Sequence, residues 1–372
     1  MEIINRSYQN WLESINHQVD FYKKGFSKNR LDGEFDWAWW KSIEGYRGKL
    51  RRHLSPFVSL VQLIRGNTIP FTKKWLNEKS ELLWNARQML DDDLSRLLFD
   101  CQLLLKFTDH TRYYYPRIDF DDFIKIESEQ DFINDDLPNS YGVFPLKLFN
   151  IHLNTSGLNP ELKIISPKIN VELLNRYRQY FITRGDIHFS PQKGEIVFDC
   201  GACIGEVSTI FAGLVGASGQ VHTFDPVPLH SRFIHLHAEL NQTLTHTFYI
   251  NVSAVSKVSS NVLGNVKDSL KISPGGLVAD NFALTSLDDY VEKNNLPCVD
   301  YIKMDIEGYE LQALEGASRI LREFQPRLVI CTYHKPEDLW EVPMLIKKLN
   351  PNYKLYFGHH SPIKWESVYY AA

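Results

Sequence analysis

The sequence has no long apolar run and no large excess of charge of either sign. Of its 372 residues, 44% are hydrophobic and 23% are charged, and the formal net charge is −4. No apolar run approaches the roughly 20 residues that a membrane-spanning helix needs, and the first seven residues lack the apolar core of a signal peptide. The slightly acidic balance argues against a nucleic-acid-binding surface spread over the whole protein. We therefore expect a cytoplasmic protein with no membrane span and no nucleic-acid partner.

Cysteine is scarce. The five cysteines are odd in number and scattered, so they do not form a disulfide framework. Cys200 and Cys203 have C-x-x-C spacing, but no second such pair and no nearby His pair completes a zinc site. Both lie in a Gly-rich turn, where small residues are needed sterically. We interpret them as small turn residues, with a redox pair as the alternative.

The length predicts more than one minimal domain. Residues 1–115 have the apolar periodicity of helices, with one face formed by Tyr8, Trp11, Leu12, Ile15 and Val19. Five of the eight tryptophans precede residue 80. We predict a helical N-terminal domain in which these aromatics form a core or a homo-oligomer contact. The alternative is an aromatic platform or cap for a sugar-like substrate.

Residues 116–185 are predicted to be a connector that packs on the following domain. Residues 106–165 are rich in aromatic and acidic side chains and are interrupted by prolines, which favours irregular structure. A helix is expected from Val171 to about Ile182. The third segment, residues 186–372, is predicted to be the catalytic domain.

Strands and helices alternate from residue 195 onward. The expected strands are residues 195–199, 220–224, 248–253, 299–304 and 327–331, followed by a terminal pair at 353–357 and 366–370. Helices are expected in most of the intervals between them, one of them spanning 309–324. This alternation predicts an α/β fold with a mostly parallel, doubly wound, Rossmann-like sheet.

The first expected strand ends on Asp199 and continues into a Gly-rich turn, Gly201 to Gly205. Such a turn brings backbone N–H groups close to a ligand. A dinucleotide site calls for G-x-G-x-x-G, and Cys203 stands where a further glycine would be expected. A carboxylate at Asp199 would repel a pyrophosphate but suits the cationic S-adenosylmethionine. The pattern favours the methyl donor, although Asp199 could instead only cap the helix.

Asp225 ends the second expected strand. A carboxylate at this position can accept hydrogen bonds from both hydroxyls of a ribose. Nicotinamide dinucleotides and S-adenosylmethionine both contain that ribose, so Asp225 does not discriminate between them. The alternative interpretation is a turn residue before Pro226.

Three motifs then resemble one known family. The segments 199–206 (DCGACIGE), 221–226 (VHTFDP) and 300–310 (DYIKMDIEGYE) look like successive motifs of the FkbM-type S-adenosylmethionine-dependent methyltransferases, and residues 333–340 (YHKPEDLW) also resemble the family. The resemblance covers roughly residues 175–372, and D-x-E-G-x-E is its most specific motif. It implies a seven-stranded methyltransferase fold and, usually, O-methylation of a sugar or polyketide hydroxyl.

The resemblance also implies roles for individual residues in a donor site. The methionine part of the donor would be held by Asp199, Gly201, Ala202 and Gly205. Asp225 would hold the ribose, and Ser253 and Ala254 would border the adenine. Glu206 and Asp305 complete the residues assigned to this site.

Methyl transfer from a sulfonium is an in-line displacement, so the protein mainly positions the acceptor. An alcohol is a weak nucleophile and gains from a general base. We expect His334, whose intrinsic pKa is near neutral, or Asp305 to take the hydroxyl proton, with Glu307 as a further candidate. His334 could instead be a helix N-terminal residue and Glu307 a turn acid.

A divalent metal is not predicted, but one alternative is left open. Asp305, Glu307 and His334, with His359 or His360, could surround an ion that lowers the pKa of the acceptor hydroxyl. The predicted function is S-adenosylmethionine-dependent O-methylation of a sugar or glycoconjugate. The alternatives are an O- or N-methyltransferase for another small molecule or peptide, a nicotinamide-dependent oxidoreductase, and a catalytically silent scaffold.

Overall fold

The computed structural model describes residues 2–23, 72–107, 124–141, 146–155, 161–260, 282–361 and 365–372. The predictions made for Trp37, Trp39 and Trp40 lie outside these residues. The chain divides into two units. The first comprises Met1–Trp84, Asp100–Pro116 and Pro362–Lys364, and the second comprises Asn85–Phe99, Arg117–Ser361 and Trp365–Ala372.

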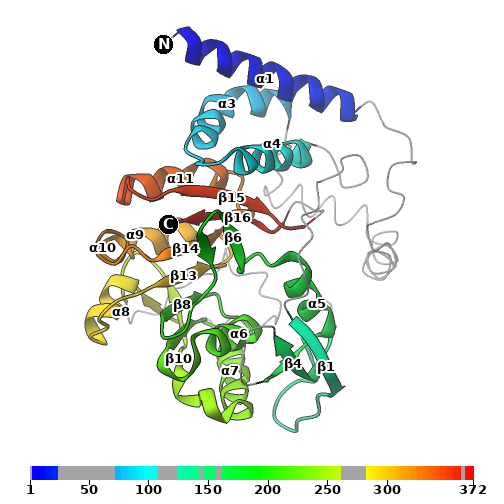
Figure 1. The fold of residues 1–372 in the computed structure, drawn as a ribbon, viewed down its shortest axis with the longest axis vertical. Coiled ribbons are helices and arrows are strands. Elements are labelled where there is room, and N and C mark those ends of the chain that lie inside the picture. Colours follow the sequence, from blue (N-terminus) through cyan, green and yellow to red (C-terminus); the bar gives the residue numbers. More distant parts are fainter. Residues whose placement is uncertain are drawn as a thin grey trace. The chain divides into compact units, whose positions relative to one another are not determined.

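The N-terminal region is helical where it is described, as predicted. Its helices are α1 (Glu2–Lys23), α3 (Lys73–Gln88) and α4 (Asp93–Phe107) (Figure 1). In the first unit the rings of Trp11 and Trp84 lie 5.4 Å apart, and the indole N–H of Trp11 donates to Asp100 at 2.9 Å. Trp75 is buried as well. These tryptophans therefore belong to the core of the unit.

The second unit contains a seven-stranded sheet with the strand order β10-β9-β8-β13-β14-β16-β15. Within this sheet, β16 runs antiparallel to the other six strands, which all run in the same direction. This position of β16 differs from the usual dinucleotide-binding sheet, in which six parallel strands follow the order 3-2-1-4-5-6. The strands are β8 (Ile196–Cys200), β9 (Gln220–Phe224), β10 (Phe248–Asn251), β13 (Tyr301–Met304), β14 (Arg327–Cys331), β15 (Leu355–His359) and β16 (Ser367–Ala371).

All seven strands correspond to predicted ones, and β9 and β14 have the predicted bounds. The helices that follow the strands are α6 (Glu206–Val215), α7 (Pro228–Leu240), α8 (Leu287–Lys293), α9 (Glu310–Glu315), α10 (Ser318–Glu323) and α11 (Asp338–Leu349). The single helix expected over 309–324 is divided at Gly316. A Cβ on that glycine would lie 2.1 Å from the Ser256 carbonyl oxygen, so this close approach requires a glycine.

The prediction of an irregular connector is wrong for its central part. Residues there form a three-stranded antiparallel sheet, β1 (Ile124–Asp131), β4 (Phe149–Thr155) and β5 (Leu162–Ser166), and a small pair, β2 (Ser140–Tyr141) with β3 (Leu146–Lys147). In β4, Ile151 and Leu153 are fully buried two residues apart. This two-residue alternation is the strand signal, and the aromatic and proline-rich composition around it obscured it.

The described remainder of the connector contains α5 (Lys168–Tyr177) and β6 (Ile182–Arg184), and β6 pairs with β7 (Ile187–Phe189) just beyond the predicted boundary. The helix expected to reach Ile182 ends earlier because Arg178 takes a left-handed conformation, with φ at 47°. Side chains of β4 and β5 share one buried apolar cluster with side chains of β8 and α6. No helix in the described ranges is both long enough and apolar enough to cross a membrane.

Candidate active site

The candidate site is built from the carboxyl ends of four neighbouring parallel strands. Asp199 lies at the end of β8, Asp225 directly follows β9, Asp305 follows β13 and His334 comes three residues after β14. Because parallel strands end at the same edge of a sheet, the fold brings these positions together, and open α/β sheets bind ligands at this edge.

The Gly-rich turn after β8 is held tightly against β13. Gly201 has φ at +83°, and a Cβ there would lie only 1.8 Å from the Asp305 carbonyl oxygen. Gly205, with φ at +96°, precedes α6 and packs against Ile234. Cys203 also lies in the left-handed region, with φ at 53°. The position at which the sequence lacks a further glycine is therefore one whose backbone favours glycine.

Asp199 is fully buried and paired with a cation. One carboxylate oxygen lies 2.9 Å from Lys303 Nζ, and the other accepts a hydrogen bond from Ser208 at 2.5 Å. Lys303 also donates to the Gly201 carbonyl at 2.8 Å. The sequence predicts that Asp199 repels a pyrophosphate. Because the Lys303 ammonium compensates the charge of this carboxylate, that repulsion does not arise. The position of β16 in the sheet, and not this charge, separates the fold from the usual dinucleotide-binding one.

Asp225 is buried at the end of β9, and its carboxylate is engaged on both oxygens. Oδ1 accepts from the Val227 N–H at 2.9 Å and contacts His230 Nδ1 at 2.7 Å, and Oδ2 accepts from the Cys203 N–H at 3.0 Å. Because a carboxylate has about four acceptor positions, Oδ2 keeps one for a ligand hydroxyl.

The other residues assigned to the donor differ in exposure. Ser253, in β11 (Ser253–Val255), is buried, and its hydroxyl has no hydrogen-bond partner in the described part of the chain. Ala254 is partly exposed. Glu206 lies in the first turn of α6 and accepts from Ser166 and Asn170, each at 3.1 Å. Glu206 is thus engaged with the connector, and burial raises the pKa of its carboxyl.

Asp305 is surrounded by hydrogen-bond donors. The Tyr180 hydroxyl donates to Oδ2 at 2.8 Å, the Tyr333 hydroxyl donates to Oδ1 at 2.9 Å, and His334 Nε2 lies 3.3 Å from Oδ1. Burial alone would raise the pKa of Asp305, but His334, Lys303 and the two tyrosines hold it below its usual value. Asp305 is therefore a carboxylate at neutral pH.

His334 lies among three carboxylates. Its Nδ1 is 2.9 Å from Glu310, and its Nε2 is 3.3 Å from Asp305 and 3.8 Å from Glu307. Burial would lower the pKa of His334, but Glu310, Asp305 and Glu307 raise it to about 9. The side chain is thus an imidazolium at neutral pH and cannot take up a further proton there.

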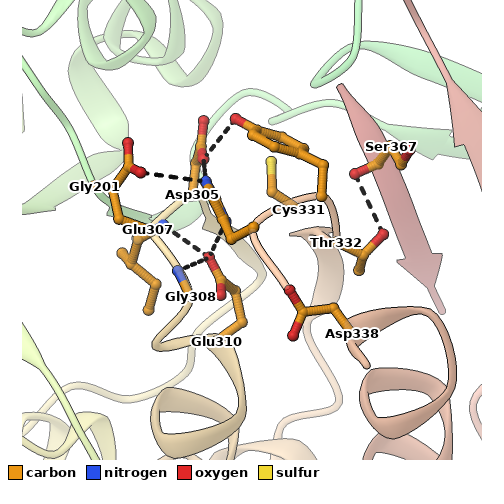
Figure 2. A network of polar contacts seen from close by, with 12 residues as sticks. Gly201, Asp305, Glu307, Gly308, Glu310, Cys331, Thr332, Asp338 and Ser367 are labelled. Carbon is orange, nitrogen blue, oxygen red and sulfur yellow. Dashed lines mark hydrogen bonds and ion pairs between the residues drawn. The ribbon is translucent and has the colours of Figure 1, made fainter. Parts of the chain in front are cut away.

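Glu310 organises the turn of the D-x-E-G-x-E motif. It is fully buried, and Oε1 accepts from the backbone N–H groups of Ile306 at 3.0 Å and Gly308 at 3.4 Å. Figure 2 shows its side chain directed at this turn. Glu307 has φ at 56° and a half-exposed side chain, and burial of its carboxyl raises the pKa.

Five residues around the site were given no individual role by the sequence analysis: Tyr141, Tyr180, His230, Glu310 and Tyr333. Glu310 and Tyr333 do lie in the family-like segments, which is a signal for them. Tyr141 and Tyr180 come from the connector, and no pattern in the sequence places a connector side chain beside a strand end.

The cysteine and metal alternatives gain no support from the geometry. The five cysteines are free thiols, and burial raises the pKa of both Cys200 and Cys203. Within the described ranges no group of three or more His, Cys, Asp and Glu side chains is arranged to hold a metal ion. His359 contacts the Ser367 hydroxyl, and His360 contacts the Tyr370 hydroxyl.

The sheet and the helices that follow its strands define a Rossmann-like α/β domain. Residues 199–353 match the family model of the methyltransferase FkbM domain. The chain therefore carries a methyltransferase FkbM domain, and the family resemblance drawn from the motifs is confirmed.

One solved structure of an FkbM methyltransferase has a similar fold. The crystal structure of methyltransferase FkbM from Methylobacillus flagellatus is 19% identical, with a TM-score of 0.52 over 80% of this chain and 60% of that chain. This chain thus spans less than two thirds of its length. Other matches are a putative rRNA methylase from Clostridium thermocellum (14% identity, TM-score 0.34, 49% and 87% covered) and fibrillarin from Aeropyrum pernix with bound S-adenosyl-L-methionine (10%, 0.36, 67% and 99%). No curated protein sequence matches the chain.

Proposed function

We propose that this protein is an S-adenosylmethionine-dependent O-methyltransferase whose acceptor is a hydroxyl of a sugar or glycoconjugate. The observation that carries the proposal is the Asp305 carboxylate. It lies beside the Gly-rich turn, is held by Tyr180, Tyr333 and His334, and follows a strand of the FkbM domain. A positioned, charged carboxylate of this kind can accept the proton of a hydroxyl.

Two observations support a donor site along the ends of β8, β9 and β10. Asp225 keeps an acceptor position on Oδ2, which suits a ribose hydroxyl. The buried Ser253 hydroxyl has no partner in the described residues and could bond an adenine edge. When bound, S-adenosylmethionine would supply a methyl group already activated on a sulfonium. In this arrangement Asp225 would bind the ribose, and Ser253 and Ala254 would border the base.

Asp305 is the better of the two proposed bases at neutral pH. His334 already carries its second proton, because the neighbouring carboxylates raise its pKa to about 9. Asp305 accepts hydrogen bonds from the hydroxyls of Tyr180 and Tyr333, one on each oxygen, so acceptor positions remain for the acceptor hydroxyl. Asp305 would take the proton of the acceptor hydroxyl as its oxygen receives the methyl group, and S-adenosylmethionine would supply that group and leave as S-adenosylhomocysteine.

His334 then acts on the reaction through Asp305. The imidazolium lies 3.3 Å from the carboxylate at Nε2 and keeps it charged before transfer. Glu310, on the other ring nitrogen, fixes the orientation of the ring. This division of roles makes Asp305 the proposed base and His334 a positioning residue.

The proposal is tested by assaying methyl transfer from labelled S-adenosylmethionine to a panel of sugar nucleotides, oligosaccharides and hydroxyl-free amine acceptors. The expected result is label in a base-stable methyl ether of a hydroxyl-bearing acceptor. Label confined to amine acceptors would move the proposal to N-methylation. Binding of the donor with no transfer to either group would support a silent scaffold instead.

A further inference from the structure

Four side chains around the ribose-binding acid are joined in a closed ring of contacts. Asp225 Oδ2 accepts from the backbone N–H of Cys203 at 3.0 Å, and Asp225 Oδ1 contacts His230 Nδ1 at 2.7 Å. On its other nitrogen, His230 Nε2 lies 2.9 Å from the Tyr141 hydroxyl. The Tyr141 hydroxyl lies 3.1 Å from Cys203 Sγ, which closes the ring.

One arrangement of the protons makes every contact of the ring a hydrogen bond. The carboxylate accepts from His230 Nδ1–H, Nε2 accepts from the Tyr141 O–H, and the Tyr141 oxygen accepts from the Cys203 S–H. Burial raises the pKa of both the Tyr141 hydroxyl and the Cys203 thiol, so each group keeps its proton. His230 is 2% exposed, and Tyr141 and Asp225 are each 7% exposed. Water therefore has little access to compete for these bonds.

The ring joins three separate parts of the second unit. Cys203 belongs to the Gly-rich turn, Asp225 and His230 belong to the end of β9 and to α7, and Tyr141 belongs to β2 of the connector. Tyr141 also packs in an apolar cluster with Ile204 of the turn. A single connector side chain thus reaches both the turn and the acid on which the proposed donor depends.

The ring also gives a physical reason for a cysteine at position 203. The backbone there has φ at 53°, in the left-handed region that is unfavourable for residues other than glycine. A glycine would remove the strain but would have no side chain to contact Tyr141. The backbone N–H of Cys203 bonds to Asp225 and its thiol contacts the Tyr141 hydroxyl. These two contacts fix the turn relative to Asp225.

We propose that Tyr141, His230 and Cys203 are positioning residues that hold the Gly-rich turn and the Asp225 carboxylate in the geometry that binds the ribose of the donor. The proposal rests on the proposed donor site at Asp225. In this arrangement the connector sets donor affinity through the Tyr141 hydroxyl, which contacts His230 and Cys203.

Tyr141→Phe tests this most directly, because it removes only the hydroxyl and keeps the buried ring. Loss of one hydrogen bond predicts an about fivefold higher Kd for S-adenosylhomocysteine by calorimetry, with kcat at saturating donor within about twofold of wild type. Hydrogen–deuterium exchange of residues 201–205, measured without donor, should become faster. Unchanged donor affinity and unchanged exchange in Tyr141→Phe would overturn the proposal.

Tyr353→Phe is a control for general destabilisation. Tyr353 is buried and donates its hydroxyl to the Pro326 carbonyl oxygen at 2.8 Å, just before β14 and at the end of that strand opposite to the candidate site. This variant should keep wild-type donor affinity even if its melting temperature falls as far as that of Tyr141→Phe. Equal weakening of donor binding in both variants would mean that general destabilisation, and not the ring, is responsible.

Position 203 provides a second, independent set. Cys203→Ala and Cys203→Ser have the same backbone strain, and only serine keeps a donor for Tyr141. Cys203→Ser should bind the donor more tightly than Cys203→Ala. The double variant Tyr141→Phe/Cys203→Ala should bind the donor no more weakly than the weaker of its two single variants. Additive losses of donor affinity in the double variant would contradict the proposal that Tyr141 and Cys203 act through one ring of contacts. If wild-type protein fails to bind S-adenosylhomocysteine, the proposed function itself fails, and this inference fails with it.

Discussion

At the scale of single residues, the surroundings of Asp305 and His334 give the two side chains opposite charges at neutral pH. Both residues follow strand ends of the parallel sheet. Their surroundings move the two pKa values apart, downward for Asp305 and to about 9 for His334. A protonated histidine beside a charged aspartate leaves the aspartate as the group that can accept a proton at neutral pH.

Asp305→Asn is expected to lower kcat by about 100-fold or more, because it removes the proposed base while keeping the shape of the side chain. The measurement is steady-state methyl transfer at saturating donor. Asp300→Asn is a suitable control, since Asp300 lies at the opposite end of β13, where it accepts from the Ile196 N–H at 2.8 Å. The control should retain kcat within about twofold. Equal activity of Asp305→Asn and wild type would remove Asp305 from the mechanism.

His334 predicts a specific dependence of stability on pH. Its pKa is about 9 in the folded protein and 6.5 ordinarily. The stabilisation from the folded environment is therefore fully present below about pH 6.5 and is lost as the pH rises through 9. Wild-type protein should lose melting temperature between pH 7 and 10, and His334→Gln should show a flatter profile over that interval. Parallel profiles would show that His334 is not held as an imidazolium.

At the scale of elements, the close contact between the turn after β8 and the end of β13 is the tightest constraint on the site. A methyl group at Gly201 would lie 1.8 Å from the Asp305 carbonyl oxygen, which is backbone and has little freedom to move. The turn and the proposed base therefore cannot be altered independently, because Gly201 lies directly against the residue that carries the carboxylate.

Gly201→Ala is expected to destabilise the protein by about 3 kcal/mol or more and to abolish donor binding, because the backbone must shift. Gly185→Ala is its matched control. Gly185 also has a positive φ, +56°, but a Cβ there meets nothing within 4 Å, so the cost should be only the conformational one of about 1–2 kcal/mol. The comparison uses denaturant unfolding of both variants. Equal destabilisation would show that the close approach to β13 adds nothing.

The same elements show what the sequence could and could not predict. Parallel strands buried on both faces are continuous apolar runs, so β9 and β14 were placed to the residue. The connector strands were missed because their two-residue alternation is short and lies among prolines and aromatics. The ion pair of Asp199 with Lys303 was also missed, although the two residues are register partners on β8 and β13. Which side chains meet across two strands depends on register, and register is not visible in a single sequence.

At the scale of the whole molecule, the proposed function depends on which nucleoside ligand the domain binds. Since Lys303 compensates Asp199, that charge no longer decides between the methyl donor and a dinucleotide. The antiparallel β16 between β14 and β15, together with the FkbM domain over residues 199–353, favours the methyl donor. The proposed base, the proposed acceptor and the connector's control of donor affinity all depend on that choice.

Calorimetric titration of the full chain with S-adenosylhomocysteine, NAD and NADP tests the claim most directly. Saturable one-site binding of S-adenosylhomocysteine is expected, with at least a tenfold loss in Asp225→Ala because a ribose hydroxyl loses its acceptor. Neither dinucleotide should bind. Saturable binding of NAD or NADP, with none of S-adenosylhomocysteine, would contradict the account.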